Sequence, residues 1–196
     1  MNIRFVPAAA GLALLLAGCG AASPPAQPPL AGARIGGPFA LIDEAGRART
    51  DQDFAGQWRV MYFGYTFCPD VCPTGAQNIA AGLKRFEGDD PGRGGRVTPV
   101  FVTIDPARDT PAALKSFTAA FHPRMVGLTG TEEAIAAVAK SYGAYRAKGD
   151  VSPGGGYLMD HSDQAYLMDP QGKPIALIPH EQGSAAVAAE LARWVK

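Results

Sequence analysis

The sequence is poor in the residues that most often bind metals or cross-link a fold, with only three cysteines and three histidines among 196 residues. It also has no net charge, because eighteen basic residues balance eighteen acidic ones. This balance gives no reason to expect nucleic acid or another polyanion as a partner. Apolar residues make up 47% and charged residues 18% of the chain, as in ordinary globular proteins. At this length we expect one folded domain.

The N-terminal residues have the pattern of an export signal. Arg4 supplies a basic start, and residues 5–17 form an apolar run that is too short to span about 30 Å of hydrocarbon. Small residues then lead to Cys19, in an order that resembles a bacterial lipobox, where cleavage precedes a cysteine that becomes acylated. We therefore expect residues 1–18 to be a lipoprotein signal peptide and Cys19 to carry the lipid. A plain signal peptide with an incidental thiol is the alternative.

Lipidation of Cys19 would also explain the odd number of cysteines, because only Cys68 and Cys72 would then remain in the folded part. It would hold the protein at the membrane, on the periplasmic side of a bacterium. Residues 19–34 are rich in proline and alanine without a hydrophobic period, which predicts an extended tether. The folded domain is expected over residues 35–196.

Strand and helix patterns alternate through that domain. We expect a hairpin at 39–42 and 47–50, buried strands at 58–63 and 97–104, helices at 74–86, 111–121, 132–142 and 184–195, a short strand at 125–128, and a second hairpin at 165–168 and 174–178. The stretch 143–159 is predicted to be mostly loop. This order indicates an α/β fold: a thioredoxin-like mixed sheet with helices on both faces and an added N-terminal β-hairpin.

The segment CPDVCP at 68–73 lies between the first buried strand and the following helix. In open α/β sheets, ligands and reactive groups gather at this place. Pro73 suits the first helical position, so we expect Cys72 to be the N-cap. The helix N-terminus would then lower the pKa of two partly exposed thiols below about 8.5. Such a pair can form a disulfide, attack one, or hold a soft metal.

A metal would need a further ligand, and the histidines are the candidates. His122 is expected to cap a helix C-terminus, and His180 to lie at the surface. His161 follows a flexible loop and precedes a predicted strand, although position alone favours an ordinary hydrogen-bonded histidine. Two thiolates and one imidazole suit copper as Cu(I) and Cu(II), and zinc would usually add a fourth ligand.

Four blocks of residues, in order along the chain, resemble the SCO/SenC family of copper chaperones. They are YFGYT at 62–66 with CPDVCPT at 68–74, VTIDP at 102–106, RDTP at 108–111, and DHS at 160–162 before YLMDP at 166–170. The resemblance implies a membrane-tethered thioredoxin-like domain that delivers copper to the binuclear copper site of cytochrome c oxidase. It implies Cys68, Cys72 and His161 as the metal ligands, with one copper per monomer. The partners would be the copper-site subunit of the oxidase and a periplasmic copper donor.

The same residues leave other functions open. The runner-up is a thiol-disulfide reductase, in which Cys68 and Cys72 keep the cysteines of the oxidase copper site reduced. Such an enzyme could work without His161, whereas a non-enzymatic metallochaperone could not. A peroxidase using Arg108 is the third alternative.

Carboxylates near the predicted site have open roles as well. Asp105 ends the second buried strand at the edge that carries the cysteines, so it could hold His161 or a nearby basic group by a hydrogen bond. It could equally serve only in the turn before Pro106. Asp109 or Thr110 is expected to cap the helix that starts at residue 111.

Overall fold

The computed structural model describes Met1 and residues 27–196. Residues 2–18 of the predicted signal peptide, and the predicted lipid attachment site Cys19, lie outside the described residues. Among residues 27–196, no helix combines the length and the apolar character needed to cross a bilayer.

A seven-stranded mixed sheet forms the centre of the domain. Its strands lie in the order β2 (Ala48–Thr50), β1 (Ala40–Asp43), β5 (Val126–Thr129), β4 (Val97–Thr103), β3 (Trp58–Gly64), β8 (Ala165–Met168) and β9 (Pro174–Ile178). The three central strands β5, β4 and β3 are parallel, and the flanking strands are antiparallel to their neighbours. All seven residues of β3 are buried, because the sheet is covered on both faces.

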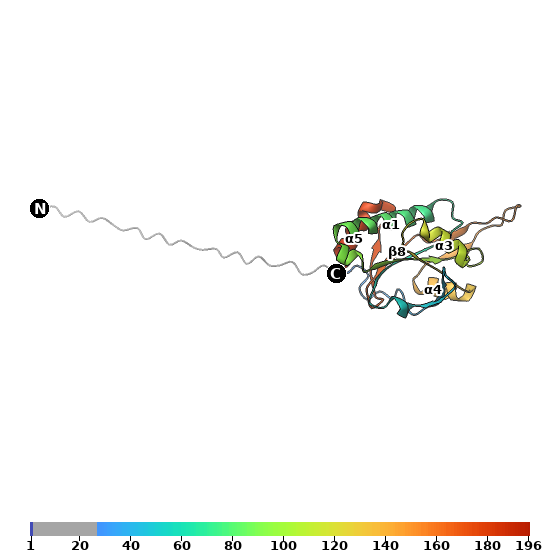
Figure 1. Ribbon diagram of the computed structural model, residues 1–196, viewed down its shortest axis with the longest axis horizontal. Helices are drawn as coiled ribbons and strands as arrows, with labels where there is room; N and C mark the ends of the chain where they lie inside the picture. The colour runs from blue at the N-terminus through green and yellow to red at the C-terminus, as the bar shows by residue number, and fades with distance from the viewer. Residues whose placement is uncertain (2–26) are drawn as a thin grey trace.

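Helices cover both faces of the sheet, and each face has its own hydrophobic core. The helices are α1 (Val71–Asp89), α2 (Pro91–Gly94), α3 (Pro111–Ala119), α4 (Glu132–Ser141) and α5 (Ser184–Trp194). Helices α1 and α5 lie together on one side of the sheet, and α4 lies on the other (Figure 1). Leu83, Leu114 and Leu191 belong to the core beneath α1, α3 and α5, whereas Phe63 and Ile135 belong to the core beneath α4. The predicted fold class is confirmed.

The threonines before α3 and α4 explain where these helices begin. The hydroxyl of Thr110 accepts a hydrogen bond from the backbone N–H of Ala113, and Thr131 does the same for Ala134, each at 3.2 Å. Each bond satisfies one of the N–H groups that a helix N-terminus leaves free. The expected cap of α3 is therefore Thr110, and Asp109 is left for another role.

Two parts of the structure differ from the sequence prediction. Helix α1 begins at Val71 with Asp70 as N-cap, so Cys72 lies inside the first turn and is not the cap. Pro73 is tolerated there because N–H groups of the first turn have no partner within the helix. The predicted loop 143–159 contains β6 (Arg146–Lys148), which pairs with β7 (Met159–His161) as a separate two-stranded sheet.

The N-terminal part of the described chain packs on the domain before residue 35. The backbone N–H of Leu30 donates to the carbonyl of Ile175 in β9 at 3.0 Å, and both Leu30 and Ile35 pack against the cores. Contacts with the domain thus extend into the predicted tether of residues 19–34, and the boundary at residue 35 stays a prediction.

Asp43 at the end of β1 holds the N-terminal hairpin together. Its buried carboxylate accepts hydrogen bonds from the backbone N–H groups of Ala45 and Arg47, both at 2.9 Å, and from the Nε atoms of Arg47 and Arg49 at 3.0 and 3.1 Å. Burial alone would raise the pKa of Asp43, but the hydrogen bonds from Arg47 and Ala45 outweigh it and lower the pKa.

We expect Asp43→Asn to lower the free energy of unfolding at pH 7 by about 1–3 kcal/mol. A carboxyl whose pKa is lower in the folded chain stabilises the fold above its unfolded pKa of about 3.9, and this contribution is lost as the pH falls through the folded pKa. The difference between wild type and variant in urea unfolding should therefore shrink below about pH 4. The exposed Asp89→Asn is the control, and an equal, pH-independent loss in both variants would contradict this role of Asp43.

Candidate metal centre

The two cysteines lie where β3 ends and α1 begins. Cys68 is in the connecting loop, at 9% exposure, and Cys72 is fully buried in the first helical turn. Both are free thiols, and the backbone N–H of Cys72 donates to the Sγ of Cys68 at 3.4 Å. A Cβ on Gly64 would lie 3.0 Å from the Sγ of Cys72, so this glycine lets the strand end pack against the sulfur.

His161 reaches the cysteines from β7, which is far from them in the sequence. Its Nε2 lies 3.4 Å from the Sγ of Cys72, and its Nδ1 lies 2.9 Å from the carbonyl oxygen of Ser162. Because a carbonyl only accepts, the contact favours the tautomer with the proton on Nδ1, which leaves the lone pair of Nε2 directed at the sulfur. The ligand atoms of Cys68, Cys72 and His161 all lie within 4.8 Å of one another.

The electrostatics of Cys72 differ from the prediction of a low-pKa, partly exposed thiol. Burial raises the pKa of the Cys72 thiol, and the nearby Cys68 and Asp163 raise it further. The helix N-terminus therefore does not decide the protonation state here, because removing water from the thiolate costs more. A bound cation would supply the missing positive charge and displace the proton. The donor set of two sulfurs and one imidazole fits copper.

Asp105 follows β4 at the same edge of the sheet as the loop after β3 that carries Cys68. Its carboxylate bonds to a nearby basic group, which was one of the two partners predicted for it. Its Oδ2 accepts from the Nε of Arg108 at 2.5 Å, and its Oδ1 accepts from the hydroxyl of Tyr157 at 2.9 Å. Arg108 also donates to the carbonyl of Tyr157 at 2.9 Å, with its guanidinium 3.7 Å from the centre of the Tyr157 ring. These contacts hold the segment before β7 against the sheet edge, and so support His161 indirectly.

Asp109 holds the loop before Cys68, a role that the sequence analysis missed. Its fully buried carboxylate accepts from the backbone N–H and the hydroxyl of Thr66 at 3.0 and 2.6 Å, and from the hydroxyl of Thr103 at 2.7 Å. The loop after β3 is thereby fastened to the end of β4. The only available signal was the position of Asp109 beside a helix start, which favoured a capping role.

We expect Asp109→Ala to lower the free energy of unfolding by about 2–4 kcal/mol, because it leaves three buried or half-buried donors without an acceptor. It should also weaken copper binding about tenfold by loosening the loop that carries Cys68. Thr110→Ala is the matched control, since it removes a helix cap worth about 1 kcal/mol and leaves the loop attached. Equal loss of copper affinity in the two variants, measured by chelator competition, would contradict the role assigned to Asp109.

A second polar cluster lies behind Cys72. The hydroxyl of Tyr62 donates to Asp163 at 2.8 Å, and the His180 ring packs on Tyr62 with its Nε2 3.2 Å from the carbonyl of Asp163. His180 is 2% exposed, so the expectation that it lies at the surface is wrong. The sequence offered no sign that the segment after β9 would fold back onto α1.

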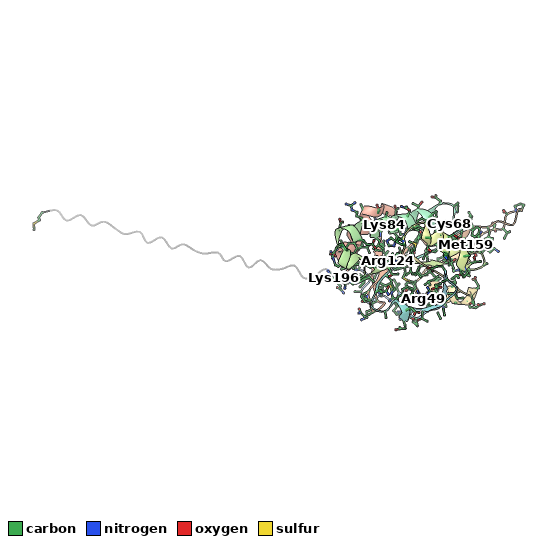
Figure 2. All side chains as sticks on the ribbon, in the orientation of Figure 1. Arg49, Cys68, Lys84, Arg124, Met159 and Lys196 are labelled. Atoms are coloured by element: carbon green, nitrogen blue, oxygen red, sulfur yellow. The ribbon has the colours of Figure 1, made fainter. Side chains whose placement is uncertain are left out.

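The mouth of the site is open and largely apolar. A cavity of about 370 Å³ lies beside Cys68 and His161. Its lining includes three hydrophobic side chains that are about half exposed, Val71, Tyr145 and Leu158, together with Asp70 and Asp160. Phe67, next to Cys68 in the chain, is also about half exposed. Cys68 and Met159 lie at the end of the domain opposite Lys196 (Figure 2).

Comparison with known proteins identifies relatives along most of the chain. The family model described as SCO1/SenC matches residues 27–196. Protein SenC from Rhodobacter capsulatus is 48% identical over 144 residues, which cover 72% of this chain and 62% of that protein. The chain spans about half the length of the curated relatives it matches.

Solved structures with copper bound are similar as well. Arabidopsis thaliana ScoI with copper bound has a TM-score of 0.75 at 34% identity, over 81% of this chain and 97% of its own. Bradyrhizobium japonicum ScoI with copper bound has a TM-score of 0.73 at 39% identity, over 82% of this chain and 99% of its own. The family model spans the whole sheet and all three donor residues. The chain therefore belongs to the SCO1/SenC family.

Proposed function

We propose that this protein binds one copper ion per chain through Cys68, Cys72 and His161, and passes it to another protein. The observation that carries the proposal is the meeting of three donor atoms within 4.8 Å from segments almost ninety residues apart. Solved ScoI proteins of similar fold contain bound copper, which supports the same metal here.

The donor chemistry suits an ion that changes oxidation state. Thiolates are soft ligands that stabilise Cu(I), and imidazole suits Cu(II). The burial of Cys72 leaves little room for extra water ligands on that side, whereas the cavity beside Cys68 and His161 is open to a partner. Copper can therefore enter and leave at the exposed side of the site.

We assign delivery of copper to the copper-site subunit of cytochrome c oxidase as the role in the cell, in line with the family resemblance. The half-exposed side chains of Val71, Tyr145 and Leu158 form an apolar rim that a partner could bury against its own copper site. Lipidation of Cys19 would hold the protein at the periplasmic face of the membrane. The N-terminal segment packs beside β9 near the start of β3, whereas the metal centre follows the end of β3, which would leave the rim accessible to a partner.

A thiol-disulfide reductase remains the alternative function, because Cys68 and Cys72 are free thiols in contact. The burial of Cys72 favours the metal over this chemistry. A raised pKa keeps Cys72 protonated, and it is the thiolate that attacks a disulfide. Cys68 would have to be the attacking group.

The test mixes the copper-loaded full-length chain with the purified copper-site domain of an oxidase subunit, in both its reduced and its disulfide form. Delivery predicts that copper moves to the reduced domain and that the His161→Ala variant fails to deliver it. A reductase predicts that the metal-free chain reduces the disulfide form, and that His161→Ala does so equally well. Disulfide reduction without any copper transfer would overturn the delivery role.

A further inference from the structure

A buried arginine, Arg59, lies at the end of the sheet opposite the metal centre. Arg59 is the second residue of β3, close to the strand start, whereas Cys68 follows the strand end. The Arg59 side chain lies on the sheet face opposite α1 and α5, where it approaches the ring of Phe54 at 5.9 Å. Only 3% of the residue is exposed. Burying a guanidinium to this extent costs several kcal/mol unless its charge is compensated.

The described residues provide little compensation. The Nε of Arg59 has no hydrogen-bond partner among them, and Nη1 has a single long contact of 3.4 Å to the backbone carbonyl of Asp51. No carboxylate of residues 27–196 lies within 4.0 Å of the guanidinium. Residues 2–26 contain no aspartate or glutamate, so they cannot supply one. Among the described residues, the guanidinium therefore has no direct ion pair.

This guanidinium borders a cavity of about 460 Å³ between the segments 37–38 and 51–55, which flank the N-terminal hairpin, and the β8–β9 turn. Tyr142 and the glutamines Gln52 and Gln171 also line it, so phenol and amide groups are available around the charge. Gly172 forms part of the wall, and a Cβ there would lie 2.8 Å from Nη2 of Arg59. A residue with a side chain would therefore press on the guanidinium, and glycine leaves room for Nη2 at the cavity wall.

Asp51 is the one acidic residue on the wall of the cavity, and its carboxylate is already engaged. Its Oδ1 accepts from the backbone N–H of Phe39 at 3.3 Å, and its Oδ2 accepts from the side chain of Gln52 at 2.8 Å. A ligand in the cavity would meet both the Arg59 guanidinium and this carboxylate. A group that carries a compact anion and a neutral polar remainder fits such an arrangement.

We propose that this cavity binds a phosphate ester, with a phosphate oxygen on Nη2 of Arg59, the guanidinium nitrogen that is neither enclosed nor hydrogen-bonded among the described residues. A guanidinium N–H donates a charge-assisted hydrogen bond to a phosphate oxygen, and the pairing strengthens when water is excluded. The volume lies in the range of small-molecule sites and exceeds what one free phosphate fills, so the glutamine amides are left to bind the remainder. The ester can be a soluble metabolite or the headgroup of a phospholipid.

The position of the cavity supports a phospholipid headgroup as the ligand. The N-terminal segment, which would lead to the lipid anchor, packs against β9 and beside the β8–β9 turn that closes the cavity. The metal centre lies beyond the other end of β3. Occupation of the cavity and loading with copper are therefore separable, and copper binding serves as an internal control for folding.

The test uses the full-length chain in a neutral detergent and follows the Nε–Hε resonance of Arg59 by NMR. Three probes are added at constant ionic strength: inorganic phosphate, glycerol 3-phosphate, and dihexanoyl phosphatidylglycerol. We expect a saturable shift of this resonance with an ester, and a rise in Tm of at least about 5 °C at a hundredfold excess over Kd. The probe that saturates at the lowest concentration identifies the source.

Two variants, each of which removes one positive charge, complete the experiment. Arg59→Met should abolish the ligand-dependent rise in Tm and still bind copper, whereas the exposed Arg85→Met should keep both properties. If Arg59→Met does not fold, the resonance titration of the wild type decides alone. No saturable shift with any probe, or equal shifts at Arg59 and Arg85, would mean that only water fills the cavity and would overturn the proposal.

Discussion

Substitution of Cys72 by serine is expected to abolish copper retention by the purified chain. A serine hydroxyl is a hard ligand that stays protonated at neutral pH, so one of two soft donors is lost while the side-chain volume hardly changes. We expect the Cu(I) affinity to fall by at least about a thousandfold, which corresponds to about 4 kcal/mol. Competition with a chromophoric Cu(I) chelator measures the loss directly.

The third cysteine provides the matched control. Cys19→Ser removes a thiol of the same chain, and we expect it to leave the Cu(I) affinity unchanged and to release the protein from the membrane fraction. The two substitutions thus separate the proposed metal ligand from the proposed lipid attachment site. If Cys72→Ser retained copper as the wild type does, Cys72 would be no ligand. If Cys19→Ser lost copper, the proposed division of roles among the three cysteines would fail.

Replacement of His161 by alanine should affect the two oxidation states of copper differently. Cu(I) can be held by two thiolates alone, so its affinity should fall by about ten- to a hundredfold. Cu(II) prefers nitrogen donors, and its binding should be lost, because no other imidazole lies within reach of the sulfurs among the described residues. The sulfur-to-Cu(II) absorption band and the electron paramagnetic resonance spectrum report the oxidised site.

The neighbouring Asp160→Ala controls for disturbance of β7. Asp160 is exposed and pairs with Ala147 in the same two-stranded sheet, so its removal tests the strand without removing a donor. We expect the Cu(II) spectrum of this variant to match that of the wild type. If the His161→Ala variant kept an unchanged Cu(II) spectrum, the imidazole would not be a ligand.

The sheet could be predicted from the sequence because its central strands are buried on both faces. Two of these strands, Val97–Thr103 and Trp58–Gly64, are nearly continuous apolar runs. Such runs are typical of strands that are covered on both faces of a sheet. The placement of Cys68 and Cys72 at a strand end followed from the same pattern. Pairing of His161 with the cysteines was inferred from a family resemblance, because no local pattern specifies which of three histidines a distant loop brings to the site.

Other features of the site depend on tertiary contacts that no local pattern encodes. The raised pKa of Cys72 results from burial, with Cys68 and Asp163 raising it further, whereas its neighbours in the sequence suggested stabilisation of the thiolate. Asp109 could not be distinguished from a helix cap until Thr66 was seen to donate to it. The strands β6 and β7 are each three residues long and are separated by residues 149–158. Strands this short show no clear alternation of apolar and polar residues, so their pairing could not be predicted.

The three donors are supported by two different sheets. Cys68 and Cys72 are supported by β3 and α1, but His161 is on a hairpin that stands outside the seven-stranded sheet and whose tip projects from the domain (Figure 1). That hairpin has three residue pairs, and it is held to the sheet edge through Arg108, Asp105 and Tyr157 and through Arg146, whose Nε donates to the carbonyl of Ile104. A shift of β7 would release the imidazole while Cys68 and Cys72 keep their supports in β3 and α1, so the coordination number of a bound ion can drop from three to two. Stepwise ligand exchange would then begin at the imidazole, and the two sulfurs would be the last to let the metal go.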